Sequence, residues 1–210
     1  MEPYIKIENL SKKIKGTTVL DNINMEFFKG NVYGIRGING SGKTMLFRAI
    51  CGLINPTEGQ ITIDKKILHK DVSFPESIGV LIENPGFLPS YTGRYNLKLL
   101  ADIKNIINYE KIDETLNLVG LDCNDKRKYK QYSLGMKQKL GIAQALMEDP
   151  DLILLDEPTN ALDEKSVENI LSIIEKEKAK GKLILIASHD KLILEQICDE
   201  IINIENGRII

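Results

Sequence analysis

Hydrophobic and polar residues follow two different periods along the chain, and the change of period divides the chain into three parts. In the first part, up to residue 83, apolar side chains alternate with polar ones, which is typical of strands. Residues 84–149 instead show the repeat of an amphipathic helix. Residues 150–210 return to short apolar runs of strand length, each followed by a helical segment.

This pattern predicts a set of strands and helices with an α/β arrangement. The predicted strands are residues 4–8, 23–27, 31–35, 59–64 (half of a hairpin), 78–82, 151–155 and 183–187, with a last short β pair that ends at Ile210. The predicted helices are residues 43–50, 95–100, 112–119, 134–147 (with Ser133 as N-cap), 165–180 and 191–198. Strand–helix alternation around an all-helical insert predicts a mainly parallel sheet. No linker or repeat divides the chain, so we expect one domain, residues 1–210, with the insert at about 84–149.

The segment GINGSGKT lies between a predicted strand and a predicted helix and fits the phosphate-loop pattern G-x-x-x-x-G-K-[ST] at every fixed position. Small residues let backbone N–H groups curl around a polyphosphate, and the following helix points its positive end at that charge. We expect Lys43 to reach the outer phosphates and the Thr44 hydroxyl to bind Mg²⁺. The residues predicted to bind the nucleotide here are Gly37, Ile38, Asn39, Gly40, Ser41, Gly42, Lys43, Thr44 and Met45.

Two other interpretations of the glycine-rich segment fit less well. A flexible glycine turn would explain the glycines but not their place between a buried strand and a helix. A dinucleotide-binding fold competes more closely, because Gly40, Ser41 and Gly42 begin as G-x-G. Met45 stands where that fingerprint requires its third glycine, so the fingerprint fails. The sequence therefore predicts a nucleoside triphosphate as the ligand.

The segment DLILLDEPTNALDE contains an apolar run that ends in two adjacent carboxylates, Asp156 and Glu157. Two like charges at the end of a buried strand are unfavourable unless a positive group lies there. In a parallel sheet, ligands bind at the carboxyl ends of the strands, where the phosphate loop also begins. We expect Asp156 to hold Mg²⁺ through its water shell and Glu157 to orient the attacking water as general base. A plain surface turn is the alternative for the acid pair taken alone.

His189 follows the predicted strand 183–187 and should emerge at the same edge of the sheet. A histidine after a strand is often an ordinary loop or capping residue. Here a polar group that can touch the γ-phosphate is needed, and His69 has no comparable position. The predicted catalytic residues are therefore Lys43, Glu157 and His189.

Composition excludes some classes of function. A net charge of -2 and a pI near 5.8 argue against a dedicated nucleic-acid binder, which would carry a basic domain. The three cysteines are scattered singly and do not form a metal framework. The first residues lack the apolar core of a signal peptide, and no apolar run approaches the roughly 18 residues of a membrane span. We expect a cytoplasmic chain that partners no nucleic acid and reaches a membrane only through another protein.

GINGSGKT, YSLGMKQ, LILLDEPTNALD and SHD, in this order in one chain, resemble the nucleotide-binding subunit of ABC transporters. The resemblance covers essentially the whole length. It implies an α/β P-loop NTPase core with a mainly parallel sheet, an N-terminal antiparallel β-subdomain and an inserted α-helical subdomain. It also implies an ATPase with ATP and Mg²⁺ that dimerises when ATP is bound, as a homodimer or with a related ATPase. Ser133 and Gly135 of one copy would then contact the γ-phosphate held by the other, and Asp163 would lie across the interface.

The chain departs from the family pattern at several positions. The segment YSLGMKQ matches the family's signature motif, LSGGQ in its commonest form, only in part, because Leu134 and Met136 replace a glycine and a glutamine. Ile14 is aligned with an aromatic residue that stacks on adenine in the family. Glu83 replaces a glutamine that touches Mg²⁺, and a carboxylate can still bind that metal. With Glu83 and the segments ENPGF and SLGMKQ, the chain resembles the branch of the family that handles peptide antibiotics in bacitracin resistance and lantibiotic immunity.

The resemblance implies a polytopic membrane permease as partner, which would place the chain on the inner face of the cell membrane. In the family, the neighbourhood of residues 85–93 receives the permease, so we expect Phe87 and Tyr91 to contact it. The alternative for that loop is a buried hinge. The alternative functions are a non-transport ABC-type ATPase and a nucleotide-dependent regulatory module. Because Asp156 and Glu157 are both present, the sequence favours hydrolysis over regulation by binding alone.

Overall fold

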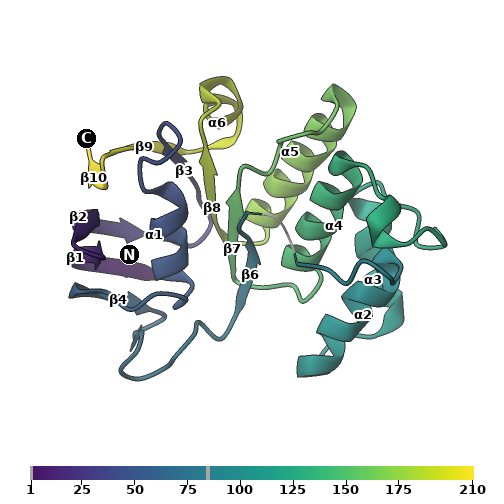
Figure 1. The fold of residues 1–210 in the computed structure, drawn as a ribbon, viewed down its shortest axis with the longest axis horizontal. Helices are drawn as coiled ribbons and strands as arrows, with labels where there is room; N and C mark the ends of the chain where they lie inside the picture. Colours follow the sequence, from purple (N-terminus) through teal and green to yellow (C-terminus); the bar gives the residue numbers. More distant parts are fainter. Residues whose placement is uncertain (1, 84–85) are drawn as a thin grey trace.

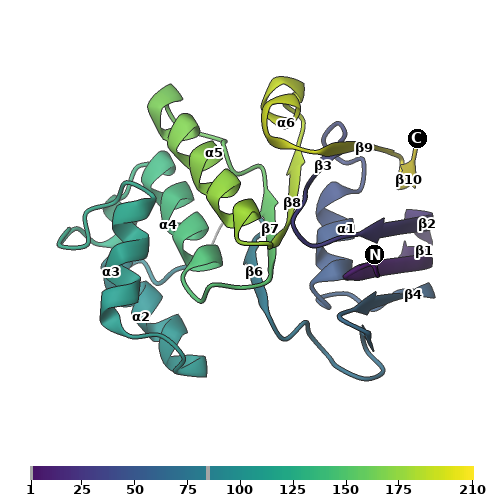
Figure 2. The same ribbon diagram turned by 180° about the vertical axis from the view of Figure 1, so that it is seen from behind.

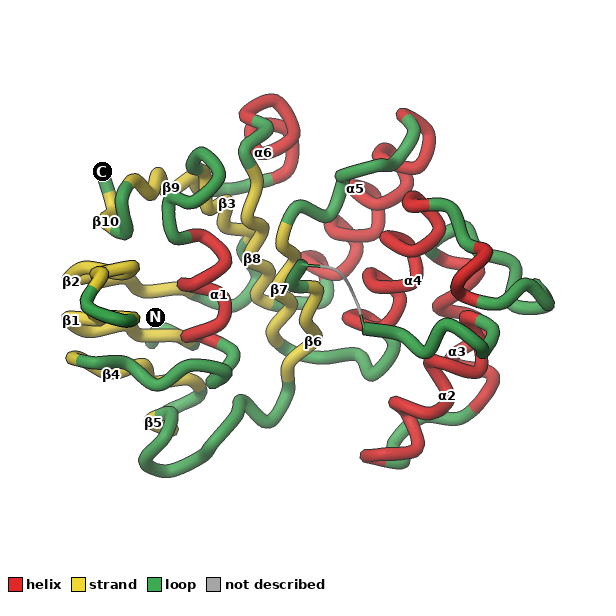
Figure 3. Tube along the Cα trace, in the orientation of Figure 1, coloured by secondary structure: helices red, strands yellow, loops and turns green. Residues whose placement is uncertain are grey.

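Two β-sheets and the helices between and beside them build the molecule (Figures 1 and 3). The structure is a computed structural model that describes residues 2–83 and 86–210. The predictions that fall on Asn84 and Pro85, including the start of the helical insert, lie outside the described residues. No helix in the described ranges combines the length and the apolar character needed to cross a membrane.

The smaller sheet is antiparallel and has the strand order β2-β1-β4-β5. Its strands are β1 (Ile5–Ile14), β2 (Thr17–Phe27), β4 (Glu58–Ile63) and β5 (Lys66–Ile67). The predicted strands 4–8 and 23–27 are only the regular ends of β1 and β2. The pairing of these two strands shifts register at several points, and each shift breaks the alternation from which a strand is recognised in sequence. The hairpin predicted around residues 59–64 is confirmed as β4 and β5.

The larger sheet has the order β10-β9-β3-β8-β7-β6. Its strands are β3 (Val32–Arg36), β6 (Ile78–Leu81), β7 (Leu152–Asp156), β8 (Leu183–Ser188), β9 (Glu200–Glu205) and β10 (Arg208–Ile209). All neighbours are parallel except β10, which pairs antiparallel with β9. The predicted mainly parallel sheet and the final β pair are both confirmed. Because β3, β8 and β7 are adjacent and parallel, their carboxyl ends meet at one edge of the sheet.

The two faces of the larger sheet pack against different helices. In β7, Leu152 and Leu154 belong to the core that contains helix α1 (Lys43–Ile50) and the smaller sheet. The alternate residues, Ile153 and Leu155, belong to the core built with the helices on the other face. Parallel strands covered on both faces therefore read as uninterrupted apolar runs. Figures 1 and 2 show α1 between the two sheets and α4 and α5 on the far side.

The remaining helices lie largely where the sequence predicts them. They are α2 (Gly93–Lys104), α3 (Tyr109–Leu118), the short 3₁₀ helix Tyr129–Gln131, α4 (Leu134–Leu146), α5 (Glu164–Ala179) and α6 (Lys191–Ile197). The Ser133 hydroxyl accepts a hydrogen bond from the Met136 N–H, so the predicted N-cap of α4 is confirmed. Helix α2 begins two residues before the prediction because Thr92 caps it by accepting from Tyr95 N–H.

Candidate functional site

The segment from Gly37 to Gly42 connects β3 to α1 and has a backbone that side chains would obstruct. A Cβ on Gly37 would lie 2.3 Å from Ser41 Oγ and 2.4 Å from the Ile204 carbonyl oxygen. Gly40 and Gly42 have φ values of 81° and 113°, in the left-handed region that favours glycine. No side chain caps α1 at Gly42, so the first N–H groups of the helix lack a side-chain partner. A loop of this kind suits an anion at its centre.

Lys43 and Ser41 place polar groups inside this loop. The Lys43 ammonium donates to the carbonyl oxygens of Gly37 at 2.7 Å and Ile38 at 3.2 Å. It lies 3.9 Å from Glu157 Oε1. Ser41 Oγ is buried and has no hydrogen-bond partner among the described residues. A buried hydroxyl without a partner is unusual in a protein, and a bound ligand is one way to satisfy it.

Thr44 and Asp156 join the start of α1 to the end of β7. Thr44 Oγ1 donates to Asp156 Oδ2 at 2.7 Å. Burial raises the pKa of the Asp156 carboxyl, and the hydrogen bond from Thr44 opposes this rise. The negative charge of Glu157 raises the pKa of Asp156 further. A positive ligand at this point would relieve the unfavourable burial of the charge.

Glu157 has a constrained backbone and a fully engaged side chain. Its φ of 49° lies in the left-handed region, and its N–H donates to the Ala187 carbonyl oxygen at 2.8 Å. Its Oε2 accepts from Ser188 Oγ at 3.0 Å. Its Oε1 lies 2.8 Å from His189 Nδ1 and accepts from the His189 backbone N–H at 3.1 Å. The predicted position of His189, at the same sheet edge as the acids, is confirmed.

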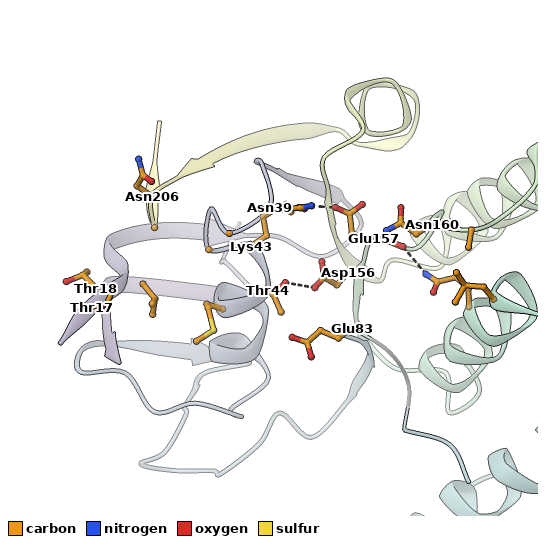
Figure 4. A pocket seen from close by; sticks show the side chains of 18 residues that line it. Thr17, Thr18, Asn39, Lys43, Thr44, Glu83, Asp156, Glu157, Asn160 and Asn206 are labelled. Atoms are coloured by element: carbon orange, nitrogen blue, oxygen red, sulfur yellow. Dashed lines mark hydrogen bonds and ion pairs between the residues drawn. The ribbon is translucent and has the colours of Figure 1, made fainter. Parts of the chain in front are cut away.

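Lys43, Thr44, Asp156 and Glu157 border one large cavity of about 740 Å³, which Figure 4 shows from close by. The cavity is lined by Thr17, Thr18, Val19, Asn39, Gly40, Gly42, Lys43, Thr44, Met45, Glu83, Leu134, Gln138, Asp156, Glu157, Asn160, Ala161, Asn206 and Gly207. Many of the predicted site residues lie in this lining. The predicted residues outside the lining are Gly37, Ile38, Ser41, Ser133, Gly135, Asp163 and His189.

One wall of the cavity was not predicted from the sequence. Thr17, Thr18 and Val19 come from the start of β2, and Asn206 and Gly207 form the turn between β9 and β10. The Gly207 N–H donates to the Ser41 carbonyl oxygen at 2.8 Å, so this turn supports the phosphate loop from behind. The dipeptide Asn-Gly between two strands is a hairpin signal, but it does not reveal that the hairpin reaches the site.

Ile14 does not line the cavity, although its sequence position suggested that it replaces an adenine-stacking aromatic residue. It lies at the end of β1, and its side chain is exposed. The residues that line this wall instead, Thr17 to Val19, come directly after the tight turn that follows β1. The wall that lines the cavity therefore begins three residues after the position aligned with the aromatic residue.

Glu83 lines the cavity and is paired with a cation. Its Oε1 lies 2.9 Å from Arg48 Nη2, and its φ of 54° is left-handed. Figure 4 shows the Glu83 side chain on the same side of the cavity as Thr44 and Asp156. Glu83 therefore lines the same cavity as Asp156 and Glu157, and its role toward Mg²⁺ stays a prediction.

The segment YSLGMKQ forms the entry to α4. Leu134 is 64% exposed and lies at the cavity lining, whereas Ser133 is occupied in capping the helix. A Cβ on Gly135 would lie 2.8 Å from the Ala161 carbonyl oxygen, so the start of α4 packs closely on the segment after Glu157. Asp163 caps α5 by accepting from the Ser166 N–H at 2.8 Å. Leu134 thus lines the cavity of its own chain, whereas Ser133, Gly135 and Asp163 are not part of the lining.

The sequence pattern of the family described as ABC transporter matches residues 20–160. The chain belongs to this family. It is 52% identical over 205 residues to the ABC transporter ATP-binding protein YybJ of Bacillus subtilis (strain 168), covering 98% of this chain and 94% of YybJ. It is 38% identical to the bacitracin transport ATP-binding protein BcrA of Enterococcus faecalis, covering 100% of this chain and 69% of BcrA. It is 39% identical to the lantibiotic transport ATP-binding protein SrtF of Streptococcus pyogenes, covering 98% and 89%.

The ABC transporter fold is also shared with solved structures. The dimeric ATP-binding cassette MJ0796, in a post-hydrolysis state bound to ADP and Pi, superposes with a TM-score of 0.88 at 26% identity. The match covers 98% of this chain and 96% of that one. The chain is thus an ATP-binding subunit of the ABC transporter family and an ATPase, and the resemblance drawn from its motifs is confirmed, including its likeness to bacitracin and lantibiotic transport proteins.

Proposed function

We propose that this subunit binds Mg-ATP in the cavity between the phosphate loop and the end of β7. Hydrolysis there would power a separate membrane permease that exports peptide antibiotics or related amphiphiles. The observation that carries the proposal is the contact of Thr44 Oγ1 with Asp156 Oδ2 at 2.7 Å, beside the Lys43 ammonium. This contact supports the proposal because it joins the first turn of α1, next to the phosphate loop, to the end of β7, although the two segments are far apart in the sequence.

The loop residues account for binding of the triphosphate. The N–H groups of the loop and of the first turn of α1 would surround the phosphates. Lys43 now donates to loop carbonyls, and the outer phosphates would replace these as stronger, charged acceptors. Thr17, Thr18 and Val19 offer the nucleoside a wall without an aromatic ring. Recognition would therefore depend mainly on the phosphates.

The residues present fit a magnesium ion that is held partly by the substrate. Among residues 2–83 and 86–210, no three His, Cys, Asp or Glu side chains converge to form a metal cage. Mg²⁺ seldom uses such a cage and is usually bound by one or two protein oxygens, waters and phosphates. Thr44, Asp156 and Glu83 would hold it, the acids directly or through water. When bound, the ion supplies positive charge against the transferring phosphoryl group.

Glu157 is the group we assign to the attacking water. Its carboxylate is held by Ser188 and His189 and lies 3.9 Å from Lys43, and Glu157 lines the cavity. Water oxygen would bond to the γ-phosphorus as the bond from that phosphorus to the leaving ADP oxygen breaks, and the water proton would pass to Glu157. His189 would contact the γ-phosphate from beside Glu157.

Dimerisation would complete the site. Cassettes of this family form dimers, as MJ0796 does with ADP and Pi bound. Ser133, Gly135 and Asp163 do not line the cavity of their own chain, which agrees with a role toward the nucleotide of a second copy or of a related ATPase. The start of α4 offers a helix N-terminus and a hydroxyl, both suited to a phosphate.

The permease and its cargo are inferred from the relatives. BcrA and SrtF are named for bacitracin and lantibiotic transport, so a peptide antibiotic is the substrate class that we propose. Phe87 packs edge-on against the Tyr129 ring, and Tyr91 is 44% exposed, which gives the proposed permease contact one anchored and one open aromatic side chain. Through that partner the subunit would be held at the inner face of the membrane.

Calorimetric titration with ATP, with and without Mg²⁺, tests the proposal. The native chain should bind ATP with a magnesium-dependent affinity, and Asp156→Asn should abolish that dependence. Asp151→Asn is the matched control, because it makes the same change just before the other end of β7, next to Lys29. Absence of magnesium-dependent ATP binding in the native chain, even with its permease present, would overturn the proposal.

A further inference from the structure

Gln138 connects α4, the helix that begins in the signature segment YSLGMKQ and is called the signature helix below, to the backbone of Glu157, the proposed general base. Its Nε2 donates to the Glu157 carbonyl oxygen at 2.8 Å. Gln138 belongs to α4, which begins directly after Ser133. Gln138 also lines the cavity, so it lies where nucleotide binding and hydrolysis are proposed to occur.

The backbone of Glu157 requires external support. A non-glycine residue at a φ of 49° is strained by contact of its Cβ with the neighbouring carbonyl. Such a conformation persists only where the surroundings enforce it. On the N–H side the support comes from the Ala187 carbonyl oxygen at 2.8 Å. On the carbonyl side it comes from Gln138 and from the Asn160 N–H at 3.2 Å, a longer bond within the same turn.

A second contact ties the same helix to the same segment. The Ala161 carbonyl oxygen lies so close to Gly135 that a Cβ there would be 2.8 Å from it. Helix α4 therefore contacts the segment from Glu157 to Ala161 at two residues near its start, Gly135 and Gln138. Because a helix moves as a rigid unit over this length, a shift at Ser133 would be transmitted to Gln138.

We propose that Gln138 is a positioning residue, which sets the orientation of the Glu157 carboxylate according to the position of α4. When the start of α4 engages a nucleotide on a second copy, the amide of Gln138 would hold the Glu157 peptide in the hydrolytic conformation. The inference rests on the proposed function, in which Glu157 acts on the attacking water. It gives the signature helix two roles. Within its own chain the helix positions Glu157, and across the dimer it contacts the nucleotide of the other copy.

Steady-state hydrolysis by Gln138→Met tests the inference, because methionine keeps the length of the side chain and removes the donor. We expect kcat to fall about tenfold, as for loss of one hydrogen bond that matters in the transition state, with KM and the calorimetric Kd for ATP unchanged within about twofold. Gln138→Glu, which replaces the donor by an acceptor, should lose at least as much. Gln144→Met is the control, since it makes the same change later on α4 at a residue of similar burial and should hydrolyse ATP like the native chain.

Combination with Glu157→Gln separates positioning from other roles. If Gln138 acts through Glu157, Gln138→Met should not lower the residual phosphate release of Glu157→Gln any further, and the ATP-dependent dimer of Glu157→Gln should persist on a sizing column. A native rate in both Gln138 variants, an equal loss in the Glu157→Gln background, or a Kd weakened by the same factor as kcat would overturn the inference. Failure of the proposed function is distinguishable, because the native chain itself would then bind no Mg-ATP.

Discussion

Arg48 forms an ion pair with Glu83, which lines the cavity, and Arg48 Nη2 lies 2.9 Å from Glu83 Oε1. The pair joins the last turn of α1 to the segment after β6. The charge of Glu83 acts on Asp156, since it contributes to raising the pKa of that carboxyl. Arg48 is thus the counter-charge that accompanies a carboxylate at a position where the family usually has a neutral amide.

Arg48→Ala should weaken ATP binding, because Glu83 would then face the triphosphate without its cation. The pair is partly exposed, so its contribution is about 0–1 kcal/mol, which corresponds to a loss of up to about fivefold in Kd. Glu83→Gln should keep ATP binding and alter turnover. The double variant should regain the native affinity, because neither unpaired charge is present. Calorimetry on the four proteins gives the coupling, and equal losses from Arg48→Ala in both backgrounds would contradict it.

Glu157→Gln should accumulate as an ATP-bound dimer. The amide keeps the size of the side chain but cannot take the proton from water, so nucleotide would bind without being consumed. Size-exclusion chromatography in saturating Mg-ATP measures the outcome. Glu164→Gln, an exposed change in the first turn of α5, is the control and should leave hydrolysis intact. A Glu157→Gln protein that stays monomeric would argue against the assigned role of Glu157.

Asp156→Asn should stabilise the nucleotide-free protein while removing its function. Burial holds the pKa of Asp156 above its ordinary value, so the folded state retains a proton at a pH where the unfolded state has lost it. Stability attributable to this group therefore falls as pH rises between the unfolded and folded pKa values. The gain in melting temperature from Asp156→Asn should reach its maximum at pH values above the raised pKa of the folded state. It should vanish at pH values below the ordinary pKa of the unfolded state. A gain that is independent of pH would disprove this origin.

Lys182→Met should destabilise the fold without touching the chemistry. Lys182 Nζ lies 2.6 Å from Glu177 Oε2, and both side chains are buried. Removing one partner of a buried pair leaves the other charge buried without a counter-charge. We expect a loss of about 3 kcal/mol in the free energy of unfolding. The value lies at the low end of the usual range because Lys180 still pairs with Glu177.

Urea unfolding measures this loss, and the double variant Lys182→Met/Glu177→Leu should recover most of it, because no charge is then left buried alone. ATP binding should be native in both proteins, since Lys182 precedes β8 and the site lies at the other end of that strand. A double variant no more stable than Lys182→Met would show that packing, not charge, dominates here.

The sequence predicts those parts of the site that are local in the chain. The phosphate loop and the acids after β7 follow from short segments, because a parallel sheet gathers the ends of its strands at one edge. The cap at Ser133 is local as well, since its partner is only three residues away.

The unpredicted parts depend on tertiary packing. Thr17 lies on a strand of the smaller sheet and Asn206 in a turn between two strands of the larger one, and neither carries a local signal for a place at the cavity. The bond from Gln138 to Glu157 depends on how α4 sits against β7, which no periodicity specifies. The position of Ile14 gives no hint of this wall, because the turn after β1 places the lining residues at the start of the next strand.

The turn at Asn206 and Gly207 has a consequence for biosynthesis. A ribosome releases the chain from its amino end, so the phosphate loop emerges long before the hairpin whose Gly207 N–H donates to the Ser41 carbonyl oxygen. A nascent polypeptide that already exposes the loop therefore still lacks its rear support. We therefore expect full affinity for nucleotide only late in translation, once the hairpin has emerged.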